Sequence, residues 1–272
     1  MEQTPSGDGE LWARLRGAGE GPPSREGWNE IQACLEAWPA DATRDGAVTW
    51  AKHALAAWPD RGYEAVTGAA LRAHRQTGAP LPPWWPLVRH VTLFGGQPIA
   101  PVEALAHVTT LWAMGGDIDL SPLLALPNLR ALDLSRNEGV LKMPSLASLT
   151  QLEKLTITQI PYVLDLDALA GLPRLADLCL AGNPNLTDLS PLQTLPALSK
   201  LNVSGCNSLA DLRPLAAIAS LRELDIGGNE RLTDIAPLAA LGGLRWLRVT
   251  GSDRIGGMDA VLQAHPQLTL VR

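Results

Sequence analysis

A repeat of 23 residues constrains this chain more than any other feature of its sequence. Three segments align without gaps, and their first residues, Leu175, Leu198 and Leu221, follow one another at this spacing. The same frame also begins at Leu129, Leu152, Leu244 and, one residue late, Leu268, and weaker copies begin upstream at Val88 and Val108. Such a period is typical of a solenoid, in which each repeat buries its apolar face against its neighbours. We therefore expect about eight repeats and a truncated last strand.

Each repeat begins with a short alternation of apolar residues. The third and fifth positions after the first leucine are apolar, as in Leu178 and Leu180, which predicts a short parallel strand. Further along the repeat, Ser190 precedes Pro191. A serine N-cap followed by proline at the first helical position predicts a short helical turn. We place this turn on the convex side of the solenoid, opposite the strands.

An asparagine or cysteine follows each strand at a fixed position. The residues at this position are Asn137, Asn183, Cys206 and Asn229. Backbone groups of the turns need hydrogen-bond partners once water is excluded, and a buried amide supplies them. We expect these side chains to bond the backbone in the turn of the next coil. Ile160 and Ser252 interrupt the series.

The repeated frame L-x-x-L-x-L-x-x-N/C resembles the leucine-rich repeat family, and within it the short, bacterial, internalin-like type. The resemblance covers residues 87–272. One extra residue after the asparagine position, as in Asn183–Leu186, lengthens the period. The resemblance implies an α/β solenoid, which is a curved repeat array with a parallel β-sheet on its concave face. It also implies a non-enzymatic scaffold that binds a protein partner on that face.

The bulky residues divide the chain into two parts. From Leu87 onward lie 42 of the 48 leucines, whereas seven of the nine tryptophans precede that residue. Residues 1–26 are rich in Gly, Pro, Ser and Glu, and we expect this segment to be flexible. Apolar residues at helical spacing predict helices that end near Trp38 and Trp58, and a third helix over 63–74. Residues 27–86 are therefore expected to form a Trp-rich α-helical cap, with a second binding module as the alternative.

The net charge and the hydropathy of the chain bear on its binding partners and on its cellular location. The net charge of −6 disfavours binding to nucleic acid. No run approaches 18 apolar residues, so we expect no membrane-spanning helix. The first ten residues lack the basic and apolar regions of a secretory signal peptide. A cytoplasmic location is the prediction, and the alternative is a bacterial effector secreted into a host cell without a cleavable signal peptide.

Residues that carry chemistry are scattered along the chain. Its five histidines show no metal-ligand spacing, and neither a phosphate-binding loop nor a nucleophile elbow is present. We expect no catalytic residue, no metal and no cofactor. Cys179 is the one nucleophile predicted to face solvent, and a cysteine-dependent enzyme is the remaining alternative. A cysteine nucleophile needs a base within hydrogen-bond reach, and the nearest concave-face histidine, His90, belongs to a coil four repeats away.

The concave face is the predicted binding surface. Side chains at the second, fourth and sixth positions after the first leucine point outward from the strands, and charges alternate along the second position. The candidate partner-binding residues are Phe94, Trp112, Met114, Asp133, Lys154, Asp177, Lys200, Asn202, Glu223, Asp225, Trp246 and Arg248. Two other interpretations remain open. The alternating charges also suit a cross-strand ion ladder, and the cluster Phe94, Trp112 and Met114 also suits packing under the N-terminal cap.

The end of the chain is predicted to be a bare strand. Leu268–Arg272 would complete the last coil with nothing obvious to cover its edge. A homodimer through this C-terminal edge is therefore a further expectation.

Overall fold

The computed structural model describes residues 9–56, 58, 65–67, 69–95, 99, 102–116, 119–137, 143–162, 165–251 and 255–272. These residues form two compact units, Met1–Thr92 and Leu93–Arg272. The first unit is mainly helical and the second is a stack of repeats, so the α/β repeat fold with N-terminal helices is confirmed. The sequence-based boundary at 86–87 stays a prediction.

The first unit contains four α-helices among its described residues. They are α1 (Gly9–Glu20), α2 (Arg25–Ala37), α3 (Ala42–Ala56) and α4 (Ala69–Thr77). Ser24 caps α2 by accepting a hydrogen bond from the backbone N–H of Gly27 at 3.0 Å. The short strand β1 (Ala65–Thr67) precedes α4, and the 3-10 helix η1 (Trp85–Leu87) leads into β2 (His90–Phe94).

Tryptophan rings build the core of this unit. The ring of Trp12 packs edge-on against those of Trp38 and Trp50, with centroid distances of 5.1 and 6.2 Å. Trp84 packs in the same way on Trp28 at 6.2 Å, and its indole N–H donates to Oε1 of Glu36 at 2.6 Å. Edge-to-face aromatic pairs add about 0.5–1.5 kcal/mol to the free energy of burial. The Trp-rich helical unit that the sequence predicted is thus a closely packed core.

Two expectations for this unit were wrong. Residues 9–20, inside the segment expected to be flexible, form α1, because Leu15 and Trp12 give this polar stretch an apolar side that packs against α2 and α3. The predicted third helix over 63–74 begins later, at Ala69. Ala65–Thr67 instead pairs with β2 as a parallel strand, which suits its β-branched Val66 and Thr67. Residues 59–64 and 68 lie outside the described residues.

The second unit is a parallel sheet whose strands follow one another in chain order. After β2, the strands are β3 (Thr110–Met114), β4 (Ala131–Asp133), β5 (Lys154–Thr156), β6 (Asp177–Cys179), β7 (Lys200–Asn202), β8 (Glu223–Asp225), β9 (Trp246–Arg248) and β10 (Thr269–Val271). Equivalent leucines face each other across each pair, as Leu178 faces Leu201 and Leu201 faces Leu224. The predicted repeat frame is therefore the observed strand register.

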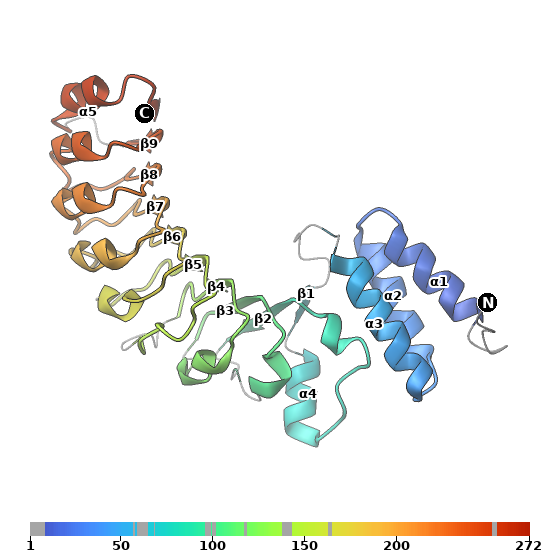
Figure 1. Ribbon diagram of the computed structural model, residues 1–272. Coiled ribbons are helices and arrows are strands. Elements are labelled where there is room, and N and C mark those ends of the chain that lie inside the picture. The colour runs from blue at the N-terminus through green and yellow to red at the C-terminus, as the bar shows by residue number, and fades with distance from the viewer. Residues whose placement is uncertain are drawn as a thin grey trace. The chain divides into compact units, whose positions relative to one another are not determined.

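Short helices line the opposite side of the repeats (Figure 1). They are the 3-10 helices η2 (Val102–Leu105), η3 (Ser121–Ala125), η4 (Leu166–Leu169), η5 (Ser190–Thr194), η6 (Arg213–Ala217) and η7 (Ala236–Ala240), followed by α5 (Met258–Ala264). The predicted helical turn is present, but its N-cap residue is Leu189 and not Ser190. Asp188 supplies the cap, since its Oδ1 accepts from the backbone N–H of Ser190 at 2.8 Å. Ser190 is therefore the first residue of the turn, and its own backbone N–H is the orphan donor that the carboxylate of Asp188 satisfies.

The asparagine side chains tie each coil to the one before it. Asn183 is fully buried, and its Nδ2 donates to the carbonyls of Ile157 and Leu180 at 2.7 and 2.8 Å. Its Oδ1 accepts from the backbone N–H of Ile160 at 2.9 Å. Asn229 makes the equivalent bonds, two to Cys206 and Val203 of the preceding coil and one to Ile226 of its own coil. The predicted backbone bonding is confirmed, except that it runs to the preceding coil and not to the next. Ser252, the second interruption of the series, lies outside the described residues.

Replacing Asn183 tests this ladder. Asn183→Ala leaves the buried backbone groups of Ile160, Ile157 and Leu180 short of a partner, so we expect the free energy of unfolding to fall by about 2–4 kcal/mol. Asn185→Ala is the matched control, because the exposed Asn185 makes one bond, to the carbonyl of Pro161. Its cost should stay below about 1 kcal/mol in urea denaturation. Equal losses in the two variants would contradict the structural role of the ladder.

The aspartates that begin the helical turns predict a loss of stability in acid. Hydrogen bonds from Ser190, Ser121 and Arg213 lower the pKa of Asp188, Asp119 and Asp211 below the ordinary aspartate value. Their contribution to stability is therefore complete above that ordinary value, and it is lost as the pH falls through the lowered values. We expect the melting temperature to drop as the pH falls below the ordinary aspartate pKa of 3.8.

A triple variant isolates this effect. Asparagine at positions 119, 188 and 211 keeps the accepting oxygen and does not titrate. Its melting temperature should therefore fall less than that of the unchanged chain over the same pH range. An identical fall in both proteins would show that these three carboxylates do not carry the acid sensitivity.

Candidate functional site

The concave face of the sheet carries two ordered rows of side chains. In the first row, Lys154 faces Asp177, Asp177 faces Lys200, and the series continues through Glu223 to Trp246. In the second row, Thr156, Cys179, Asn202, Asp225 and Arg248 face one another in the same order. The repeat register therefore brings the candidate residues from Lys154 to Arg248 onto one continuous surface.

Ion pairs link neighbouring strands along the first row. Nζ of Lys154 lies 3.0 Å from Oδ2 of Asp177, and Nζ of Lys200 lies 2.9 Å from Oε2 of Glu223. The bond to Glu223 raises the pKa of Lys200, so this ammonium stays charged at neutral pH. These side chains are about half exposed, and exposed pairs contribute roughly 0.2–1 kcal/mol each. Two ion pairs of the predicted ladder are therefore present, and each is weak.

The second row contains residues that serve the fold. Oδ1 of Asp133, Asn202 and Asp225 each accepts a hydrogen bond from the backbone N–H two residues later, at 2.8 to 3.0 Å. Asp225 is also buried, and its Oδ2 pairs with Nη2 of Arg248 at 2.8 Å. These candidates were predicted from the outward register alone. The structure instead engages them in turns that hold the ends of the strands.

An apolar cluster lies at the start of the concave face. Phe94 is 51% exposed and Trp112 is 42% exposed, while Met114 is half-buried. The backbone N–H of Gly95 donates to the carbonyl of Met114 at 3.2 Å, which places the end of β2 beside the end of β3. Trp112 faces Asp133 across the next strand pair. Large apolar side chains that remain this exposed are typical of a contact surface for another molecule.

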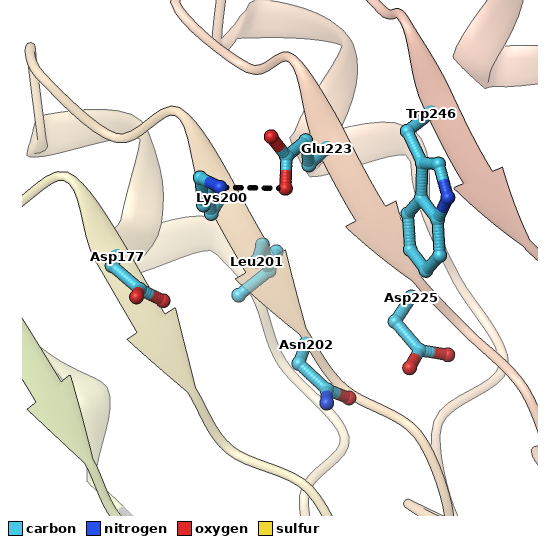
Figure 2. A pocket seen from close by; sticks show the side chains of 7 residues that line it. All are labelled: Asp177, Lys200, Leu201, Asn202, Glu223, Asp225 and Trp246. Carbon is cyan, nitrogen blue, oxygen red and sulfur yellow. Dashed lines mark ion pairs between the residues drawn. The ribbon is translucent and has the colours of Figure 1, made fainter. Parts of the chain in front are cut away.

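A hollow of about 170 Å³ opens between β6 and β9 (Figure 2). The residues that line it are Asp177, Lys200, Leu201, Asn202, Glu223, Asp225 and Trp246. Six of these seven were candidates from the sequence. Leu201 was missed, because it belongs to the inward-pointing set of the alternation, and no sequence signal distinguishes it from the other core leucines.

Cys179 lacks the surroundings of a catalytic thiol. Burial raises the pKa of Cys179, which favours the protonated thiol over the nucleophilic thiolate. Its neighbours in the row are Thr156 and Asn202, and neither of them is a general base. Within the described part of the chain, no group of three acidic, histidine or cysteine side chains is placed to hold a metal ion.

Comparison with known proteins agrees with this architecture. The family model for leucine-rich repeats in two copies matches residues 173–217. No curated protein sequence matches the chain at a significant level. The family match covers the repeats that begin at Leu175 and Leu198, which are two of the three most regular repeats.

Solved structures extend the likeness over most of the chain. Internalin C2 from Listeria monocytogenes is 29% identical, with a TM-score of 0.56, and the match covers 74% of this chain and 92% of that one. A second internalin from the same organism, inlF, is 22% identical with a TM-score of 0.53. That match covers 97% of this chain and 74% of the other, and it shows a shared fold.

Two substitutions compare how much a buried carboxylate and an exposed carboxylate contribute to stability. Asp225→Ala removes the buried partner of Gly227 and Arg248, so we expect the free energy of unfolding to fall by about 2 kcal/mol or more. Asp177→Ala removes an exposed pair and should cost less than about 1 kcal/mol. Urea denaturation of both variants measures the difference. If Asp177→Ala proved as costly as Asp225→Ala, the two rows would not differ in role.

Proposed function

Since this chain carries leucine-rich repeats of the internalin-like type, we propose that it is a non-enzymatic scaffold that captures a protein partner on its concave face. The observation that carries this proposal is the exposure of Phe94 and Trp112 on that face. Exposed aromatic side chains surrounded by polar ones are the usual composition of a binding hot spot. A partner that covers them gains hydrophobic free energy without any reordering of the scaffold.

The rest of the face suits the rim of such an interface. The charged row from Lys154 to Glu223 is exposed, and its ion pairs are only weakly stabilising. A partner that disrupts these pairs therefore removes little stabilising free energy. The strands that carry it are held rigidly by the buried leucine and asparagine ladders. A preformed surface of this kind loses little conformational entropy on binding.

The strand β10 is the basis of a second, separate prediction. β10 pairs with β9 on one side, and the half-buried Leu268 and Leu270 leave the terminal coil less covered than its predecessors. An exposed strand edge can pair with another strand. A homodimer through this edge therefore stays a prediction, which the mass of the protein in solution tests directly.

The cellular location is a further prediction. No helix among the described residues combines the length and the apolar character that a membrane crossing requires. A cytoplasmic location and delivery into a host cell as an effector are the two alternatives. Export of a reporter fused to residues 1–30 would distinguish them.

Removing the exposed aromatic rings tests the proposed function. Trp112→Ala and Phe94→Ala should each abolish capture of the partner from native lysate, because a truncated hot-spot ring costs about 2 kcal/mol or more of binding free energy. The melting temperature should change little, since both rings are exposed. The measurement is a pull-down with the purified chain, followed by thermal unfolding of the same variants.

Leu124→Ala is the matched control. Leu124 is 36% exposed and belongs to η3, on the opposite side of the repeats. This variant should capture the partner as the unchanged chain does. A loss of several degrees in the melting temperature of Trp112→Ala would instead assign its ring to packing. Unchanged capture by both aromatic variants would remove the concave face from consideration.

A further inference from the structure

We propose that the hollow between β6 and β9 takes an arginine side chain of the protein partner, an inference that rests on the proposed function and names the chemistry of its second contact. The hollow has a volume of about 170 Å³ and is open to solvent along the concave face. It is too small for a folded element, since a helix with its side chains is about 10 Å wide. A single long side chain is the natural occupant.

The charge of the lining favours a cation. Three carboxylates, those of Asp177, Glu223 and Asp225, line the hollow together with one ammonium, that of Lys200. Lys154 and Arg248 pair with two of these carboxylates from outside the lining. Each carboxylate thus has one cationic partner, but within the lining itself carboxylates outnumber the ammonium, so the hollow offers more acceptors for a cationic N–H donor than donors for an anion.

The carboxylates of the first row can accept further donors. The ion pairs use Oδ2 of Asp177 and Oε2 of Glu223 (Figure 2 shows the pair of Glu223 with Lys200). An ionised carboxylate has about four acceptor positions on its two oxygens. Because the existing pairs are exposed and contribute roughly 1 kcal/mol or less, a guanidinium can share or replace them at little cost.

Trp246 makes arginine a better occupant than lysine. Its indole lies directly across the β8–β9 pair from Glu223, and the ring and the carboxylate line the same hollow. A planar guanidinium stacks on an indole face while its N–H groups bond a neighbouring carboxylate. An ammonium is a compact, strongly hydrated point charge and uses the flat ring less well.

The hollow and the apolar cluster lie at opposite ends of the concave face. Trp112 belongs to β3 and Trp246 to β9, so at about 4.8 Å per strand the two rings are separated by roughly 29 Å along the sheet. An extended segment of about nine residues spans this distance. The partner is thus expected to present an apolar side chain and an arginine at this separation.

Binding of a small probe tests the hollow without the partner. The probe is N-acetyl-arginine amide, titrated into the full chain, and the readout is the chemical shift of the backbone amides of Asn202 and Asp225. We expect saturable shifts with arginine, at least threefold weaker binding with the lysine analogue, and none with citrulline. Citrulline has the same shape without the charge, so an identical curve for citrulline or for lysine would overturn the assignment.

Four variants locate the contact. Glu223→Gln and Trp246→Leu should each weaken arginine binding at least threefold. Trp246→Phe retains an aromatic face and should bind within twofold of the unchanged chain. Glu153→Gln removes an exposed carboxylate that does not line the hollow and should have no effect. Unchanged binding in Glu223→Gln and Trp246→Leu would contradict the proposal.

The test of arginine binding in the hollow and the test of partner capture can fail independently. If the chain captures a protein through Trp112 but its hollow ignores arginine, the inference about the hollow is wrong and the scaffold function stands. If the hollow binds arginine but the chain captures no protein, the scaffold function is wrong.

Discussion

Buried hydrogen bonds between successive coils are the constraint on which the rest of this structure depends. The strands are only three to five residues long, so few ladder bonds hold each one to its neighbour. Asn183 and Asn229 each add two buried bonds to backbone groups of the preceding coil and one to their own coil. The turn just before each asparagine uses left-handed backbone, which Gly182 and Gly228 adopt without strain and Arg136, before Asn137, adopts at some cost. The buried hydrogen bonds and the left-handed turns together fix the register of the strands. That register determines which side chains lie on the concave surface.

That register decides which polar residues remain available to a partner. Every outward position is equivalent in the repeat frame, yet the side chains of the first and second rows have different structural roles. Asp133, Asn202 and Asp225 use their side-chain oxygens to close the turns after their strands. Lys154, Asp177, Lys200 and Glu223 bond only one another across exposed strands. In the proposed function, the contacts with a partner are therefore assigned to the charged row and to the exposed aromatic rings.

The parts of the fold that repeat could be predicted, and the parts that occur once could not. A pattern seen in several copies averages out local exceptions, so the strands, their order and their facing residues followed from the spacing of the leucines. The first unit offers no such averaging. Gly9–Glu20 has a polar composition, and the partners that stabilise it as a helix, such as Trp38 and Trp50, are distant in sequence. The cap by Asp188 was missed for a different reason, since the turn begins one residue earlier than the Ser190–Pro191 pair predicts, and the N–H of Ser190 itself then needs an acceptor.

The same reasoning explains why the site could be only half predicted. Position on the concave face is a property of the repeat, but exposure is a property of local packing, and it separates Asp225 from Glu223 although both stand on β8. A hollow also needs residues from neighbouring strands to leave space between them, as Asp177, Asn202 and Trp246 do. The combination of carboxylates and an indole in one hollow gives this face a chemical preference that no single repeat contains. Specificity in such a solenoid thus arises between coils, from differences in sequence that the shared backbone brings into contact.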